Sequence, residues 1–240
     1  MCCLFLAASS TVAIAQTSVV DLVNPIIGTN GMGHTFPGAC VPFGLVQLSP
    51  DTDTIPHNVD GKYQPRSYEY CAGYQHKDSS IVGFSHTHFS GTGHSDLGDI
   101  LIMPTTGTLK LNPGTATNPD GGYRSRFSHG TEISRPGYYE VMLTDYGVKA
   151  QLTTTQRVGI HKYTYPTNSE NQRIILDMIH GIYNYDGKVL WTNIRVENDT
   201  LVTGYRITNG WARTNYTYFA MSFSKPITHY GCEEKAKVNY

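Results

Sequence analysis

The stretch from Tyr68 to Asp99 gathers the residue types that could carry chemistry, set among glycines. A glycine-rich polar segment has little apolar surface of its own, so its order must come from what it packs against or binds. Tyrosine and histidine on such loops stack on sugars, hydrogen-bond to hydroxyls or ligate metals. The alternative is an inert connection between strands. The side chains concerned are Tyr68, Tyr70, Tyr74, Phe84, Phe89, His76, His86, His88, His94, Asp78, Asp96 and Asp99.

Two histidines two residues apart, His86 and His88, form the feature most like a metal site, with His94 and Asp96 shortly after. In an extended segment, residues two apart point the same way, so both imidazoles could ligate one ion. A zinc hydrolase built on His86, His88 and His94 would also need an open water position. Because this spacing alone is not specific, we favour the alternative, in which these histidines hydrogen-bond sugar hydroxyls or bridge strands.

Three tyrosines, Tyr68, Tyr70 and Tyr74, form the strongest general binding feature. A tyrosine ring can lie against the apolar face of a sugar while its hydroxyl finds a polar partner. The alternative is that these rings fill the core or edge of a sandwich.

Several acidic residues lie close together in the sequence and could be catalytic, because glycosidases use a carboxylic acid and a carboxylate. Acids close together in loops are more often turn-formers that accept backbone N–H bonds, and we interpret these pairs in that way. No Gly-x-Ser-x-Gly motif is present, and the glycines around Gly91 lack the lysine and the helix of a phosphate loop. The pairs are Asp96 with Asp99, Asp51 with Asp53, and Glu69 with Asp78.

The composition indicates a globular chain with many turns. Of 240 residues, 39% are hydrophobic and 15% charged, with 24 glycines, 12 prolines and 17 tyrosines. A net charge of −1 offers no basic surface for a phosphate backbone, so we expect no nucleic-acid partner. A neutral sugar would need no electrostatic steering.

The N-terminus resembles a secretory signal. Leu4–Ile14 is apolar but too short to span a bilayer, and Ala13-Ile14-Ala15 fits a cleavage site, although a basic n-region is missing. We therefore expect a signal peptide over 1–15, a mature domain over 16–240, secretion or a periplasmic location, and no membrane span. The alternative is a buried first strand. The remaining cysteines, Cys40, Cys71 and Cys232, are odd in number, which excludes a full disulfide framework.

The pattern beyond residue 122 predicts strands. Apolar and polar residues alternate around residues 139–143 and 148–152 and continue through 158–165, and no window shows a helical stripe. This predicts an all-β fold, an antiparallel sandwich or barrel. The C-terminal residues 231–240 lack a strand pattern, so we expect the domain to continue past them. Further strands are expected over 40–49, 100–103 (stopped by Pro104), 173–179, 188–197, 201–208 and 216–223.

Long motifs resemble the N-terminal domain of glycoside hydrolase family 92, the bacterial calcium-dependent exo-α-mannosidases. They follow the family's order from about Asp21 to the end of the chain. The motifs are VNPIIGTNGMGHTFPGACVPFGLVQLSPDT (Val23–Thr52), YCAGYQHKDSSIVGFSHTHFSGTGHSDLGDILIMPTTG (Tyr70–Gly107) and SRPGYYEVMLTDYGVKAQLTTTQRVGIHKYTYP (Ser134–Pro166), with weaker matches at TGYR (Thr203–Arg206), GWA (Gly210–Ala212) and FSKP (Phe223–Pro226).

The resemblance implies a large N-terminal β-sandwich docked on a C-terminal (α/α)6 barrel, with the active site between them. It implies removal of terminal α-linked mannose with inversion, by an acid, a carboxylate base and a calcium ion that belong mainly to the helical domain. No catalytic residue and no metal ligand is therefore assigned to this chain, and the implied partners are a mannose-containing glycan and that helical domain.

The same resemblance implies that the sandwich supplies one wall of the substrate pocket, including an aromatic from the loop Arg66–Tyr74. Family members often carry WxWCSGY there, whereas this chain has Tyr68 and Tyr70. His94 replaces a cysteine or small residue. The substrate-binding candidates are Tyr68, Tyr70, Cys71, His86, His88 and Asp96. We expect the N-terminal domain of an α-mannosidase of the α-1,2 type; the alternative is a stand-alone carbohydrate-binding sandwich without catalysis.

Overall fold

A computed structural model describes residues 18–91 and 96–233 and confirms the all-β prediction. All strand ladders in these ranges are antiparallel. They form three larger sheets and two hairpin-sized ones. The four helices described, all short 3-10 segments, are η1 (Val19–Leu22), η2 (Pro65–Tyr70), η3 (Pro119–Gly121) and η4 (His129–Thr131).

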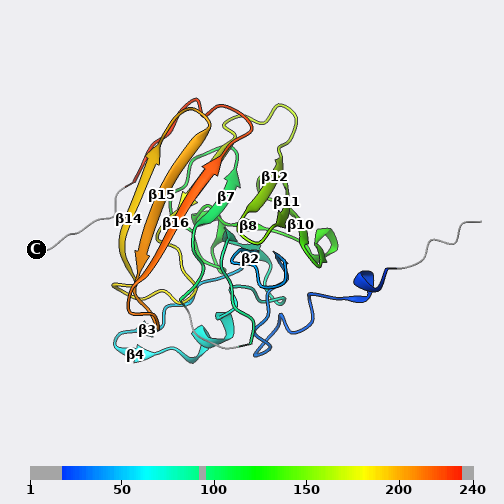
Figure 1. The fold of residues 1–240 in the computed structure, drawn as a ribbon, viewed down its shortest axis with the longest axis vertical. Helices are drawn as coiled ribbons and strands as arrows, with labels where there is room; N and C mark the ends of the chain where they lie inside the picture. Colours follow the sequence, from blue (N-terminus) through cyan, green and yellow to red (C-terminus); the bar gives the residue numbers. More distant parts are fainter. Residues whose placement is uncertain (1–17, 92–95, 234–240) are drawn as a thin grey trace, which may run out of the picture.

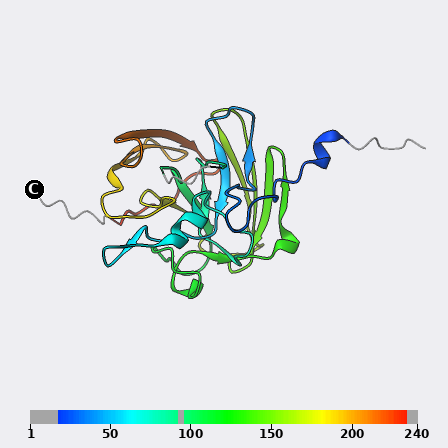
Figure 2. The same cartoon turned by 90° about the horizontal axis from the view of Figure 1, so that it is seen from below.

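The larger sheets form layers (Figures 1 and 2). The central sheet has the order β1 (Ala39–Cys40), β2 (Gln47–Asp51), β6 (Gly83–Ser85), β7 (Leu101–Thr105) and β13 (Arg173–Asp177). A second sheet has the order β12 (Gly159–Thr164), β11 (Val148–Thr154), β10 (Tyr138–Leu143) and β9 (Ile133–Arg135). The third contains β14 (Val189–Val196), β15 (Leu201–Thr208) and β16 (Asn215–Ser222). The small sheets pair β3 (Asn58–Val59) with β4 (Lys62–Tyr63) and β5 (Ser80–Ile81) with β8 (Ser125–Arg126).

The core lies between the central and second sheets. Every other residue of β10 and β11 is buried, because side chains of a strand alternate between its two faces. Their inward side chains, such as Val141 and Leu152, meet Leu48, Phe84 and Met103 of the central sheet in one apolar cluster. This is the expected sandwich.

The third sheet lies on the other side of the central sheet, so that β7 stands between β14–β16 and β10–β12 in Figure 1. A wide cleft of about 3880 Å³ separates it from β12 and β13. The third sheet is attached to the rest of the domain by buried polar side chains, among them Arg206 of β15. The part of the chain that the structure describes contains no helix suited to crossing a membrane.

Three details of the sequence-based prediction were wrong. The strand expected over 40–49 is a β1–β2 hairpin, with a turn at Phe43 (φ 58°). Pro104 does not end its strand, because it lies within β7. The neighbouring strand β6 pairs with β7 only at Phe84, opposite Ile102, so no hydrogen bond to β6 requires the N–H group that proline lacks. The stretch Tyr68–Asp99 also contributes to the core, through Ile81 and Phe84.

Candidate functional site

Loops from several parts of the chain meet at the end of the molecule that carries β3 and β4 (Figure 1). These loops lie far apart in the sequence. Backbone hydrogen bonds join them: His76 to Thr29, Gly91 to His34, His57 to Asn184, Ile182 to Leu97, and Asn209 to Lys188. Loops held together at one end of a sandwich are the usual place for a binding site.

Aromatic side chains gather on these loops. The half-buried ring of Tyr68, on η2, meets the ring of His34 edge-on at 4.6 Å between centroids. The His57 ring lies 5.0 Å from that of Tyr63 and 5.4 Å from that of Tyr183. Such rings combine an apolar face with a hydrogen-bonding edge, which suits a neutral polyol.

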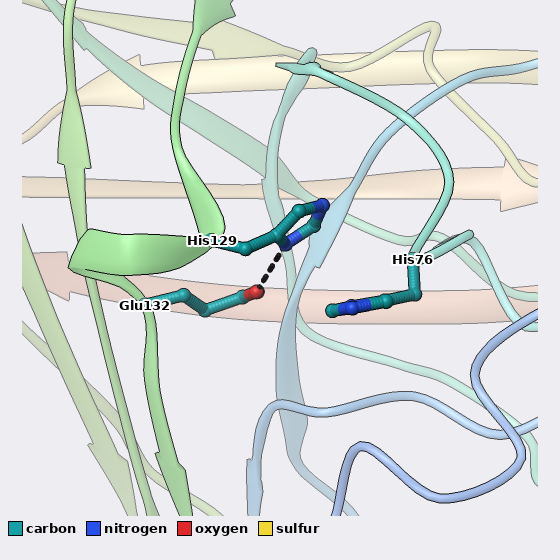
Figure 3. A group of neighbouring side chains, drawn as sticks. All are labelled: His76, His129 and Glu132. Atoms are coloured by element: carbon teal, nitrogen blue, oxygen red, sulfur yellow. Dashed lines mark hydrogen bonds and ion pairs between the residues drawn. The ribbon is translucent and has the colours of Figure 1, made fainter.

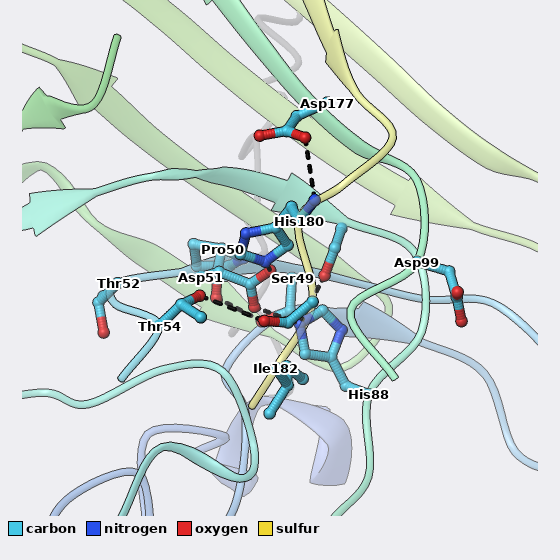
Figure 4. A network of polar contacts seen from close by, with 12 residues as sticks. Ser49, Pro50, Asp51, Thr52, Thr54, His88, Asp99, Asp177, His180 and Ile182 are labelled. Carbon is cyan, nitrogen blue, oxygen red and sulfur yellow. Dashed lines mark hydrogen bonds and ion pairs between the residues drawn. The ribbon is translucent and has the colours of Figure 1, made fainter. Parts of the chain in front are cut away.

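A buried carboxylate, Asp51, holds this end of the molecule together (Figure 4). It is the last residue of β2, and no part of its side chain is exposed. His88 Nε2 lies 2.8 Å from Oδ1, and His180 Nε2 lies 2.8 Å from Oδ2. Burial alone would raise the pKa of Asp51, but the two histidines outweigh it and hold that pKa below its usual range. Gly73 approaches so closely that a Cβ there would collide with Oδ1.

The hydrogen bonds of His88 define its charge. Its Nδ1 lies 2.7 Å from the carbonyl oxygen of Gln47, and its Nε2 faces the Asp51 carboxylate. A carbonyl and an ionised carboxylate can only accept, so both ring nitrogens of His88 donate. The pair is therefore an imidazolium and a carboxylate, a buried ion pair that joins β2 to the loop after β6.

A second buried ion pair attaches the third sheet. Arg206 of β15 places its Nε 3.0 Å from Asp99 Oδ1, and both side chains are almost fully buried. The Arg206 guanidinium also donates to the carbonyl oxygen of His180. Nearby, the Lys188 ammonium donates to the carbonyl oxygens of Ile182 and Tyr183. Burial, followed by the charge of Arg206, lowers the pKa of Lys188 to about 7.

His86 belongs to a different hydrogen-bonded chain. Its Nδ1 lies 2.7 Å from the carbonyl oxygen of Ile100 and its Nε2 lies 3.0 Å from His161 Nε2, while His161 Nδ1 lies 2.7 Å from the Tyr163 hydroxyl. One set of tautomers satisfies all three contacts with both imidazoles neutral. Burial lowers the pKa of His86 to about 4 and holds that of His161 well below its usual range, which fits this neutral pair.

Comparison with known proteins shows to which family this chain belongs. The model of the glycosyl hydrolase family 92 N-terminal domain matches residues 22–239. The chain belongs to family 92. A family GH92 alpha-mannosidase from Bacteroides thetaiotaomicron, solved in complex with mannoimidazole, is 44% identical, with a TM-score of 0.78 over 87% of this chain. The chain covers 26% of that protein, so it spans about a quarter of its length.

Two further comparisons show glycosidases. A GH92 inverting mannosidase from B. thetaiotaomicron VPI-5482 is 26% identical, with a TM-score of 0.62, over 88% of this chain and 26% of that one. An uncharacterized secreted glycosidase from Arthroderma benhamiae is 28% identical over 170 residues, which is 67% of this chain and 19% of that protein.

The six predicted substrate-binding residues of this family 92 domain lie in different surroundings. Tyr68 is half-buried at the loop surface. Tyr70 is 3% exposed and its hydroxyl donates to Asp78, which leaves no ring face for a sugar. Cys71 is 1% exposed, and burial raises its thiol pKa to about 11. Such a thiol is an inert packing group.

The structure does not bring His86 and His88 together. The chain bends after β6 ends at Ser85, so the alternation expected of an extended segment is lost, and the imidazoles turn to His161 and to Asp51 respectively. The idea of a shared metal ion is therefore wrong for this pair. His94 lies outside the described residues.

The proposed carboxylate pairs are each engaged in structural contacts. Asp96 accepts the backbone N–H groups of Trp211 (2.6 Å) and Ala212 (2.8 Å), and fixes the loop between β15 and β16. Asp53 lies 3.1 Å from Arg124 Nη2, and Glu69 lies 2.5 Å from Lys77 Nζ. These contacts agree with the interpretation of these acids as structure-forming.

Sequence reasoning missed His57, His180, Lys188 and Arg206. A signal for one of them was available: Arg206 shares a strand face with Val202 and Thr208, which are buried. A charge at a core-facing position implies a buried partner. No local pattern marks His180, whose partner lies 129 residues away.

Proposed function

We propose that this protein is a secreted or periplasmic exo-α-mannosidase, which removes terminal α-linked mannose, of the α-1,2 type, with inversion. The observation that carries the proposal is the 44% identity, over 87% of the chain, to an alpha-mannosidase solved with mannoimidazole. The description of a relative as secreted supports export.

In this proposal the chain supplies a wall of the substrate pocket and packs on a helical catalytic domain. Tyr68 is the group best placed to touch a sugar, because its ring lies on the loops and is partly exposed. Tyr70, Cys71 and His88 do not contact the sugar in this proposal. They support the Tyr68 loop by holding it against β2. Asp96 acts on the loop of Trp211, whose side chain is 76% exposed.

Calcium is implied by the family resemblance, but the described residues do not fit it. Calcium takes six to eight oxygen ligands. The buried carboxylates of Asp51 and Asp99 are already paired with histidine and arginine. Our proposal therefore assigns calcium to the helical domain and derives no step from it within this chain.

The test is hydrolysis of the four mannobioses (α-1,2, α-1,3, α-1,4 and α-1,6) by the full-length protein, with the product anomer followed by NMR. We expect the α-1,2 linkage to be cleaved fastest and β-mannose to appear first, because inversion reverses the anomeric configuration. Activity on no α-mannoside would overturn the proposal. Mannose binding without turnover would favour the stand-alone carbohydrate-binding sandwich.

A further inference from the structure

Three side chains, one from the loop that contains His76 and two from the η4 region, converge on one point. His76 precedes β5, His129 lies on η4, and Glu132 immediately follows η4. Each offers a nitrogen or oxygen ligand atom, and these atoms all lie within 4.8 Å of one another. Figure 3 shows the three side chains pointing toward a common space.

The local sequence explains the placement of two of them. A 3-10 helix has three residues per turn, so residues i and i+3 eclipse one another. His129 and Glu132 have this spacing, and His129 Nδ1 lies 2.8 Å from Glu132 Oε2. The Ser128 side chain accepts the Gly130 N–H at the start of η4, and the Phe127 ring contacts His129 edge-on.

His76 approaches from a different part of the chain. Its ring centroid lies 4.0 Å from that of His129, with 36° between the ring planes. Its hydrogen-bond contact, with the Tyr74 hydroxyl, is long at 3.4 Å. Two imidazoles therefore face the same carboxylate from two segments that are 53 residues apart (129 − 76).

Two tyrosines orient the carboxylate. Tyr139 donates to Glu132 Oε1 at 2.6 Å, and Tyr74 donates to both carboxylate oxygens at 2.9 and 3.0 Å. The Glu132 side chain is only 2% exposed, whereas His129 is 37% exposed. A carboxylate that ligates a metal is usually held in place by hydrogen-bond donors in an outer shell, and the two tyrosine hydroxyls supply such donors to Glu132.

We propose that His76, His129 and Glu132 form a zinc site. Two imidazoles and one carboxylate suit zinc and its neighbours among the transition metals, and do not suit calcium, which prefers oxygen ligands. Zinc–ligand bonds of about 2.0–2.2 Å require ligand atoms roughly 3.4 Å apart in a tetrahedron, so small side-chain rotations would close the site. The exposed edge at His129 leaves room for water as a fourth ligand. This site is separate from the proposed glycosidase function.

Bound zinc would cross-link two segments. It would join the loop before β5 to η4, and so reinforce the hydrogen bonds that Tyr74 already donates to Glu132 between the same two segments. The metal would stabilise the folded chain because the unfolded chain does not hold the three ligands together.

The experiment measures Zn²⁺ binding by the full-length protein after chelator treatment, in competition with a chromogenic chelator. We expect the wild type to bind one equivalent of zinc. The zinc affinity should fall at least about 100-fold in His76→Asn and in His129→Asn, and roughly 10–100-fold in Tyr139→Phe, which changes a hydrogen-bond donor to Glu132. The matched control is His229→Asn, at an exposed histidine whose described contact is with Thr228, and it should bind zinc like the wild type. His76 is half-exposed, so its variant should fold.

A second measurement keeps the test independent of other metal sites in the full-length protein. Zinc should slow amide hydrogen exchange over residues 74–79 and 127–133 in the wild type and not in His76→Asn. Equal zinc affinity in the wild type and both ligand variants, or unchanged exchange in these two segments, would overturn the proposal.

Discussion

Replacing Asp51 by asparagine should destabilise the domain more than any other substitution of similar size at this end of the molecule. Asparagine has the same shape but no charge, so the imidazolium of His88 loses its counter-ion in a fully buried position. The second contact, to His180, is weakened as well. Removing one partner of a buried ion pair costs about 3–5 kcal/mol, and we expect Asp51→Asn to lower the free energy of unfolding by that amount at pH 7.

The pH dependence distinguishes this mechanism from a simple packing defect. The pKa of Asp51 is lowered on folding, so its contribution is present above the unfolded-state pKa of about 3.9 and is lost as pH falls towards the folded-state value. The wild type and the variant should therefore differ most near neutral pH, and the difference should narrow below about pH 4.

The assay is urea denaturation followed by circular dichroism, at pH 7 and in steps down to pH 3. Asp60→Asn is the matched control: Asp60 is exposed between β3 and β4, and this change should alter stability by less than about 0.5 kcal/mol. A loss below 1 kcal/mol for Asp51→Asn at pH 7, or one that stays constant with pH, would show that the His88 contact is not an ion pair.

Three further predictions concern the loops and the neutral imidazole pair. Tyr68→Ala in the full-length protein should raise KM for mannosides by a factor corresponding to about 1–3 kcal/mol, whereas Tyr70→Ala should lower the melting temperature; unchanged kinetics for the first would remove the stacking role. Because its pKa falls to about 4 on folding, His86 should make the wild type lose stability as pH drops from 6.5 to 4, and His86→Gln should flatten that slope in urea titrations. Asp96→Ala removes two hydrogen bonds from the loop of Trp211 and should cost about 1–3 kcal/mol of stability, with a loss of mannoside affinity measurable by calorimetry; equal affinity would separate this loop from the site.

The regular strands could be predicted from the sequence, and the irregular loops could not. The strand expected over 201–208 is β15 without change, because alternating burial leaves a clear period of two. The pairing of Asp51 with His180 depends on how distant segments meet, which no local pattern encodes. His86 and His88 show the same limit, since a single bend after Ser85 sends their side chains to different partners.

The distances along the chain between the partners of Asp51 have a consequence for the order of folding. His88 follows it by 37 residues and His180 by 129, so the second contact closes a very long loop. Such contacts form late, because the chain must first lose the entropy of bringing remote segments together. During synthesis, Asp51 and His88 leave the ribosome well before His180. The aromatic loops should therefore acquire their final geometry only after β13 has been made, and a nascent chain stalled before that point should remain open to proteases at these loops.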